Sequence, residues 1–342
     1  MLHPIKAALY LAAIFSVLQA SPLTARLVRA ALDVGSGQTK MTVAAVDETT
    51  GRPTQVLFAE ETPLLLGHDF KQSKNGRLSD NILLELENIL THYRTIATDL
   101  GTTEFVGVAT AVFRESKNGA DFINNMKDKL DLRLEVISQE EEGMMGFLSA
   151  VAASGKEAQN IIAWDSGGAS FQITLSEGES VEVYKGPWGA SKVQAAMVEL
   201  QGKDFTKIQT VNPAKLEHVV ALQQKIIKSL PPLSQKLKAR LSNPAVDVVA
   251  IGGPYSAFKM VALTTHKQFF TKEDVWAQIE VLTGLTDEQL SQYPEKEMLI
   301  PRLTLIHTVM KHFDIPRVHY FQTVGSTLGI LMSPQLWPVP VQ

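Results

Sequence analysis

A short turn rich in glycine and serine occurs twice in this chain, each time between two apolar strands, and it constrains the possible folds more than any other feature. The first copy covers residues 31–39 (ALDVGSGQT) and the second covers residues 164–171 (WDSGGASF). In both copies an aspartate ends the first strand, and these aspartates, Asp33 and Asp165, are 132 positions apart (165 − 33). Such a turn presents backbone N–H groups to an anion, and the aspartate beside it can hold a cation or a water. Two such hairpins facing each other predict a phosphate site between two lobes.

These turns supply most of the candidate site residues. Glycine and serine are ordinary turn residues, so either copy alone would be weak support for a binding site. The repetition between strands strengthens the prediction. The candidate phosphate-binding residues are Gly35, Ser36, Gly37, Gly167, Gly168, Ala169 and Ser170. Asp33 and Asp165 are the candidate ligands of a cation.

The composition indicates a globular protein with a sizeable core. The chain has 342 residues, enough for two domains, of which 45% are hydrophobic and 20% are charged. A net charge of −4 argues against a nucleic-acid partner, because such proteins normally carry a strongly basic surface. The absence of cysteine excludes thiol catalysis, disulfides and cysteine-bound zinc.

Residues 1–25 have the pattern of a secretory signal. A weakly basic start precedes an apolar run from Ala7 to Leu18, and the small residue Ala20 lies just before Pro22. The run is too short to span a membrane comfortably, so no stable span is expected once the signal is removed. We therefore predict a periplasmic or secreted protein if the signal is used, and a cytoplasmic one otherwise. The alternative interpretation is a buried first helix.

Strands and helices alternate after residue 25. Strands are predicted at residues 26–34, 41–46, 56–62, 105–109, 134–137, 245–251 and 318–322, with a hairpin within 161–175. Helices are predicted from residue 80 and at residues 122–130, 138–153 and 301–312. This order predicts an α/β protein with a duplicated two-lobed fold and a cleft between the halves. The predicted domains are an N-terminal lobe at 26–140, a C-terminal lobe at 141–331 and a tail at 332–342.

Three consecutive glutamates, Glu140 to Glu142, lie at the start of one predicted helix. Ser138 and Glu141 form a capping box, and a carboxylate in a first helical turn gains about 0.3–1 kcal/mol from the helix dipole without any catalytic role. Glu142 lies further into the helix, where capping does not need its side chain. It is therefore the candidate general base, because a base that activates water against a phosphoryl group must reach that water directly.

Other candidate residues follow predicted strands. Arg114 is the candidate phosphate clamp, because a guanidinium pairs bidentately with phosphate oxygens, and a surface arginine in a loop is the alternative. Gly252 and Gly253 could bring the backbone of the second lobe close to a ligand, although a plain strand-to-helix turn explains them as well. Four lysines could line the path of a polyanionic ligand, although a solvated surface lysine is the expected interpretation of each: Lys40, Lys117, Lys185 and Lys192.

Taken in order, these segments resemble the exopolyphosphatase/guanosine pentaphosphate phosphatase (Ppx/GppA) family of the actin-like ATPase superfold, a ribonuclease H-like architecture. The most specific stretches are residues 109–130 (ATAVFRESKNGADFINNMKDKL) and 134–143 (LEVISQEEEG). The resemblance implies a site between the lobes, where Mg²⁺ and backbone turns hold terminal phosphates and a glutamate activates water. By motif position that glutamate is Glu142, the metal-associated aspartate is Asp165, and the phosphate-clamping arginine is Arg114.

The chain departs from the family pattern at several positions. Gly37 stands where the family usually has asparagine, and Ala169 stands in place of a third glycine. Gln172 replaces an acidic residue that often helps the metal, and Met144 replaces an arginine. A glutamine cannot supply a negatively charged ligand, so weaker metal binding is expected.

The expected function is phosphoanhydride hydrolysis, in particular an exopolyphosphatase activity that releases orthophosphate from the end of inorganic polyphosphate with Mg²⁺. One alternative is a weakened homologue that binds polyphosphate or a nucleotide without turnover. Others are a guanosine pentaphosphate phosphohydrolase and a kinase or ATPase of the same superfold, since fold alone does not decide chemistry. Export would disfavour the pentaphosphate, because that nucleotide is made and used inside cells. A homodimer is left open.

Overall fold

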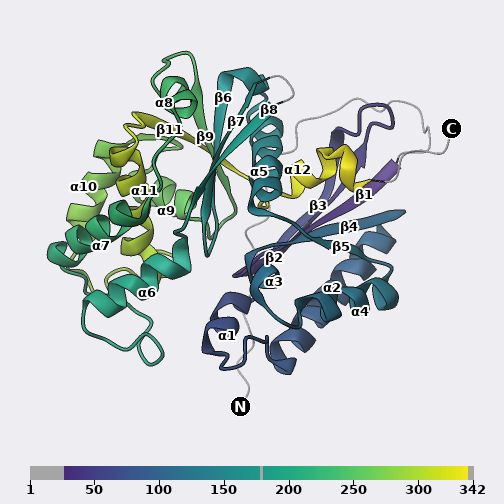
Figure 1. Ribbon diagram of the computed structural model, residues 1–342, viewed down its shortest axis with the longest axis horizontal. Coiled ribbons are helices and arrows are strands. Elements are labelled where there is room, and N and C mark those ends of the chain that lie inside the picture. The colour runs from purple at the N-terminus through teal and green to yellow at the C-terminus, as the bar shows by residue number, and fades with distance from the viewer. Residues whose placement is uncertain (1–26, 178–179, 338–342) are drawn as a thin grey trace.

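The computed structural model describes residues 27–177 and 180–337, which form two lobes, each built on one β-sheet (Figure 1). The predicted signal segment, residues 1–25, lies outside the described residues. Within the described part of the chain, no helix combines the length and the apolar character needed to cross a bilayer.

The N-terminal sheet has the strand order β3-β2-β1-β4-β5. Its strands are β1 (Leu27–Val34), β2 (Gln38–Val46), β3 (Pro53–Pro63), β4 (Glu104–Ala109) and β5 (Arg133–Val136). Neighbours among β1, β2 and β3 pair antiparallel, whereas β4 runs parallel to both β1 and β5. The helices of this lobe are α1 (Leu66–Gln72), α2 (Asp80–Asp99), α3 (Ala111–Glu115) and α4 (Gly119–Leu130).

Helix α2 begins where the sequence predicts, because the Ser79 side chain accepts a hydrogen bond from the Ile82 N–H group. Its buried residues Leu86, Leu90 and Tyr93 recur at helical spacing and belong to the same hydrophobic core as Leu32 of β1. The alternating and periodic patterns in the sequence therefore correspond to real buried faces.

The C-terminal sheet has the strand order β10-β11-β9-β6-β7-β8. Its strands are β6 (Ile161–Ser166), β7 (Phe171–Glu177), β8 (Ser180–Gly186), β9 (Asp247–Gly252), β10 (Phe269–Thr271) and β11 (Arg317–Gln322). The helices that follow β8 in this lobe are α6 (Ala190–Leu200), α7 (Leu216–Ser229), α8 (Gln235–Leu241), α9 (Ala257–Thr265), α10 (Lys272–Leu282) and α11 (Leu299–His312).

The two sheets repeat one plan, which confirms the predicted duplication. The order β3-β2-β1-β4-β5 in the first lobe matches the order β8-β7-β6-β9-β11 in the second, with the same parallel and antiparallel pairings. The three-residue strand β10 adds an edge to the second sheet. The sequence did not predict β10, because a strand this short has almost no periodicity to detect.

Helices α5 (Gln139–Ser154) and α12 (Thr327–Met332) pack against each other between the sheets (Figure 1). Leu331 and Trp337 are buried in one hydrophobic core with Val108 of β4 and Met145 of α5. The Gly329 N–H group donates a hydrogen bond of 2.7 Å to Ser149 Oγ. The sequence analysis divides residues 327–337 between the C-terminal lobe and a tail. These residues instead pack on the N-terminal sheet, because their apolar side chains cover the face that bears Val108.

Candidate active site

The two predicted hairpins have the same strand register and the same turn hydrogen bond. In the first, the Gly35 N–H donates to Gln38 O at 2.9 Å, and Asp33 pairs with Lys40 across β1 and β2. In the second, the Gly167 N–H donates to Ser170 O at 2.9 Å, and Asp165 pairs with Gln172 across β6 and β7. Each position in the second hairpin is therefore 132 residues after its counterpart (165 − 33 and 172 − 40).

Both hairpins line one cavity of about 120 Å³. A cavity of this size is large enough for several waters, or for phosphate groups in their place. The cavity contains every residue predicted for the site except Arg114: Asp33, Gly35, Ser36, Gly37, Glu142, Asp165, Gly167, Gly168, Ala169, Ser170, Gly252 and Gly253. The sequence therefore selected residues that the fold does bring together.

The turns retain backbone donors for a ligand. Within the described residues, no hydrogen bond uses the N–H groups of Ser36, Gly37, Gly168 or Ala169. These N–H groups belong to residues that line the cavity, and successive unpaired N–H groups in a turn form a concave anion site. The backbone of the turns can therefore bind phosphate oxygens without help from side chains.

Helix α6 supports the second turn from behind. The Ala190 N–H donates to Gly167 O at 3.0 Å, and the Ser191 N–H donates to Gly168 O at 2.9 Å. Gly189 precedes the helix, and a Cβ atom there would lie 2.5 Å from the Gly168 carbonyl carbon. The sequence analysis did not identify Gly189, because its requirement for a small residue comes entirely from the turn that packs against it.

Glu142 is positioned by its helix and by Arg114. The predicted capping box is present: Ser138 Oγ accepts from the Glu141 N–H at 3.2 Å, and the Glu141 side chain accepts from the Ser138 N–H at 2.7 Å. Glu142, one residue further along α5, lines the cavity. Its Oε2 accepts a hydrogen bond of 3.0 Å from Arg114 Nη2, and Arg114 Nη1 donates to Ile137 O at 2.7 Å.

Arg114 lies on the short helix α3 and not in a loop. Two of its guanidinium nitrogens are used by Glu142 and by the Ile137 carbonyl, and Arg114 is not among the described residues that line the cavity. In this structure Arg114 therefore orients the candidate base, and its expected role as a phosphate clamp stays a prediction.

Burial, together with repulsion from neighbouring carboxylates, raises the pKa values of Glu142 and Asp165 at the cavity. Burial raises the pKa of Glu142 to about 7, with further increases from Asp33 and Asp165 that oppose the effect of Arg114. Burial likewise raises the pKa of Asp165 to about 6, opposed by Lys40 and reinforced by Asp33. A general base with a pKa near 7 is suited to accept a proton at neutral pH.

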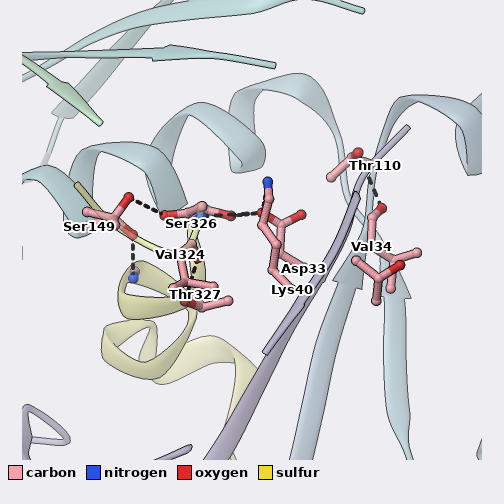
Figure 2. Close-up of polar contacts among 12 residues, drawn as sticks. Asp33, Val34, Lys40, Thr110, Ser149, Val324, Ser326 and Thr327 are labelled. Carbon is pink, nitrogen blue, oxygen red and sulfur yellow. Dashed lines mark hydrogen bonds and ion pairs between the residues drawn. The ribbon is translucent and has the colours of Figure 1, made fainter. Parts of the chain in front are cut away.

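Lys40 is not the solvated surface lysine that the sequence analysis expects. Its side chain is only 18% exposed and lies beside Asp33, with 3.5 Å between Nζ and Asp33 Oδ2 (Figure 2). Burial alone would lower the pKa of Lys40, but Asp33, Glu61 and Asp165 together raise it, so the amine is a fixed cation. The expectation failed because the pairing of β1 with β2 turns Lys40 toward the cavity, opposite Asp33.

Asp33 also forms hydrogen bonds with a residue far along the chain, Ser326. Its Oδ2 accepts hydrogen bonds from Ser326 Oγ at 2.9 Å and from the Ser326 N–H at 3.3 Å, as Figure 2 shows for the two facing side chains. These residues are separated by 293 positions, so no local sequence signal could predict the contact. Ser326 thereby fixes the orientation of the Asp33 carboxylate at the cavity.

Glu61 is a cavity residue that the sequence analysis missed. It pairs with Lys40 across β2 and β3, and it faces Gly253 of the other lobe so closely that a Cβ atom at Gly253 would lie 1.7 Å from Glu61 Oε2. This oxygen is buried without a hydrogen-bond partner among the described residues. Burial raises the pKa of Glu61, as do Asp33 and Glu295, against the effect of Lys40.

The oxygen-rich cavity suits a hard cation. Asp33, Asp165, Glu61 and Glu142 supply the type of donor that Mg²⁺ prefers, and the unpartnered Glu61 oxygen is a vacant acceptor. Within the described residues, no three acidic or histidine side chains converge closely enough to form a metal site on their own. The residues therefore fit Mg²⁺ held by one or two carboxylates, with water and phosphate oxygens as its other ligands.

Known proteins share this sequence pattern and architecture. A sequence model of the Ppx/GppA phosphatase family matches residues 42–333. Exopolyphosphatase 1 of Mycobacterium leprae is 27% identical over 164 residues, which are 47% of each chain. Exopolyphosphatase 2 of Mycobacterium tuberculosis is 22% identical over 266 residues, 76% of this chain and 81% of the other. The chain thus aligns with about half the length of the first of these relatives.

Two solved structures illustrate the shared fold. The Aquifex aeolicus member of the Ppx/GppA family superimposes with a TM-score of 0.69 at 19% identity, covering 91% of this chain and 98% of that one. An exopolyphosphatase from Cytophaga hutchinsonii superimposes with a TM-score of 0.68 at 15% identity, covering 89% and 96%. At such identities the likeness shows the fold alone.

The duplicated sheets, with glycine-rich turns from both lobes lining one cavity, define a protein of the actin-like class. The family model covers most of the chain, and the predicted family is thereby confirmed. This protein belongs to the Ppx/GppA phosphatase family.

Proposed function

We propose that this protein is a phosphoanhydride hydrolase, specifically an exopolyphosphatase that releases orthophosphate from the end of inorganic polyphosphate. The observation that carries the proposal is Glu142, a carboxylate that lines the cavity between both turns and is oriented by Arg114. Its pKa, raised to about 7, suits a base that accepts a proton from water. Family membership and the similarity to curated exopolyphosphatases support the same reaction.

In the proposed reaction the turns bind the terminal phosphate through their backbone N–H groups. Glu142 accepts a proton from a water whose oxygen attacks the terminal phosphorus, the bridging P–O bond breaks, and the shortened chain leaves with the electron pair. Lys40 supplies fixed positive charge beside the anionic oxygens. Catalysis would then rest on position and electrostatics, as is general for phosphoryl transfer.

We propose Mg²⁺ as the cofactor, held by Asp165 and Asp33 together with phosphate oxygens. Bound there, it would neutralise negative charge on the substrate. The carboxyl groups already present would gain from a cation, since burial and mutual repulsion raise the pKa values of Asp165 and Glu61.

The test is release of orthophosphate by the purified full chain from long-chain polyphosphate, with and without Mg²⁺. Parallel reactions contain guanosine pentaphosphate, or ATP with a phosphoryl acceptor. The rate of orthophosphate release is expected to be higher with polyphosphate than with the other substrates. Faster release from the pentaphosphate would transfer the proposal to that substrate, and transfer from ATP to the acceptor would identify a kinase.

Gln172 favours one second candidate, a homologue that binds polyphosphate but turns it over slowly. Its side chain is buried, its Nε2 donates to Ser170 Oγ at 3.3 Å, and it occupies the position opposite Asp165. A neutral amide at that place adds no negative charge for a cation. Tight binding of polyphosphate without phosphate release would support this candidate.

Replacing Gln172 by Glu is expected to lower the Mg²⁺ concentration for half-maximal activity by about tenfold, because it adds a carboxylate beside Asp165. The added buried charge should also lower the melting temperature of the metal-free protein, and Mg²⁺ should restore it. Titration calorimetry with Mg²⁺ and thermal melting measure both effects. Gln194→Glu, at a buried glutamine that does not pair with Asp165, should destabilise without changing Mg²⁺ affinity.

Replacing Arg114 by Met is expected to move the acidic limb of the pH–rate profile upward. Glu142 must be deprotonated to act, so activity should fall as the pH drops through about 7. Arg114 lowers the pKa of Glu142, and its removal should raise that pKa by about 1–3 pH units. The pH dependence of kcat/KM for wild type and variant measures the change, and an unmoved limb would contradict the assignment of Glu142 as the base.

A further inference from the structure

Arg302 is a buried cation at the same cavity that the mechanism above does not use. Arg302 lies on α11 of the C-terminal lobe and is only 4% exposed. It lines the cavity together with Asp33, Lys40 and Gly253. Buried arginines are rare unless paired, because the charge loses its hydration. The hydrogen-bond partners of this guanidinium therefore show whether its charge is fully compensated within the protein.

The pairing of Arg302 is incomplete. Nη2 donates to Glu295 Oε2 at 2.6 Å and approaches Met298 Sδ at 3.4 Å. Nε and Nη1 are buried and have no hydrogen-bond partner among the described residues. A buried donor without a partner costs about 1–3 kcal/mol, and more when it is charged. Glu295 accounts for one edge of the guanidinium only.

The vacant donors suit an anionic ligand with paired oxygens. A guanidinium offers its N–H groups in a planar fork that matches phosphate oxygens bidentately. Glu61, Glu295 and Arg302 all line this cavity, so the ion pair of Arg302 lies at the site of the proposed reaction. Glu142 and Arg302 line the cavity from different helices, α5 and α11, so they can contact different phosphate groups of one substrate.

We propose that Arg302 binds a phosphate group that follows the terminal one in the substrate, through Nε and Nη1. The inference rests on the proposed function, because it assigns the second phosphate subsite of the same cavity. Arg302 is then a specificity-determining residue: it favours substrates with consecutive phosphates over single phosphate groups. Glu295 offsets part of the charge of the guanidinium in the absence of substrate.

The experiment measures binding separately from turnover. Tripolyphosphate and orthophosphate are titrated into the full chain carrying Glu142→Gln, which suppresses hydrolysis, with and without Arg302→Met. The additional change to Met should weaken tripolyphosphate binding by about 10- to 100-fold, the loss expected for charge-assisted hydrogen bonds. Tripolyphosphate should then bind little better than orthophosphate. Arg302→Lys keeps the charge but not the planar set of donors, so its affinity for tripolyphosphate should lie between that of the protein with Arg302 and that of Arg302→Met.

Two further variants separate binding from a structural role. Arg317→Met removes an arginine of β11 that is half-exposed and outside the cavity, and it should leave both affinities unchanged. Glu295→Gln removes the negative partner, so it should tighten tripolyphosphate binding if Arg302 is a ligand group. Weakening of binding by Glu295→Gln as large as that by Arg302→Met would mean that the ion pair only supports the fold.

A folded Arg302→Met variant with wild-type affinity for tripolyphosphate would overturn the inference. Should that variant not fold, Glu295→Gln decides: tighter binding supports the inference, and unchanged or weaker binding overturns it. Failure of the proposed function looks different. Wild-type chain that releases no phosphate, yet binds tripolyphosphate in a manner sensitive to Arg302, would refute the hydrolase and retain the subsite.

Discussion

Replacing Glu142 by Gln is expected to slow phosphate release from polyphosphate by about 10²–10⁴-fold, the usual contribution of a general base. The amide keeps the shape of the side chain but cannot take a proton from water. Substrate affinity should be unchanged or tighter, because a neutral group replaces a carboxylate beside Asp33, Asp165 and an anionic ligand. Steady-state rates and calorimetric affinities for tripolyphosphate measure the two effects separately.

The adjacent residue provides the matched control. Glu141 lies next to Glu142 on α5 but caps the helix through Ser138 and does not line the cavity. Glutamine serves equally well at that position of a capping box, so Glu141→Gln should keep both activity and melting temperature. Equal activity of the two variants would rule out Glu142 as the base.

Replacing Gly189 by Ala is expected to reduce kcat/KM by about 10²-fold, although Gly189 is not among the residues that line the cavity. Its φ of −144° is open to any residue, so space and not conformation requires glycine. The added methyl group would lie 2.5 Å from the Gly168 carbonyl carbon and 2.6 Å from Ala169 N, and backbone atoms cannot move aside cheaply. The second turn must shift, and displacements near 1 Å at a reacting centre carry a cost of this size.

Gly202→Ala is the control for this prediction. Gly202 follows the other end of α6, has a φ of +71° and lies outside the cavity. Alanine there should lower the free energy of unfolding by about 1–2 kcal/mol through backbone strain and leave kcat/KM unchanged. If the loss of kcat/KM in both glycine variants is proportional to the decrease in melting temperature, Gly189→Ala acts through stability and not through the position of the turn.

The sequence predicted the hairpins, the capping box and the periodic helices because these depend on residues close together in the chain. The Gly35–Gln38 and Gly167–Ser170 hydrogen bonds close turns of a few residues. The Ser138–Glu141 box lies within one helical turn. Local chemistry of this kind is written in residue order, so it could be identified without coordinates.

The charged part of the site was predicted less well. Lysine side chains are usually solvated, and Lys40 is mostly shielded from solvent only because the sheet places it opposite Asp33 and Glu61 at the cavity. Glu61 and Arg302 carry no motif: Glu61 matters because it faces Gly253 of the other lobe, and Arg302 because its helix places it at the cavity. Sequence periodicity indicates which face is apolar but not which charges meet across a cleft.

The sequence alone thus determined a duplicated α/β protein with two glycine-rich turns and a glutamate at a helix start, since strand pattern, turn residues and helix caps are local properties. Only the tertiary structure decided that both turns open on one cavity, that Ser326 orients Asp33 across 293 positions, and that Arg114 contacts Glu142. Contacts between distant segments arise when complete sheets and helices dock. Their electrostatic consequences, including the raised pKa of Glu142, therefore exist only in the folded chain.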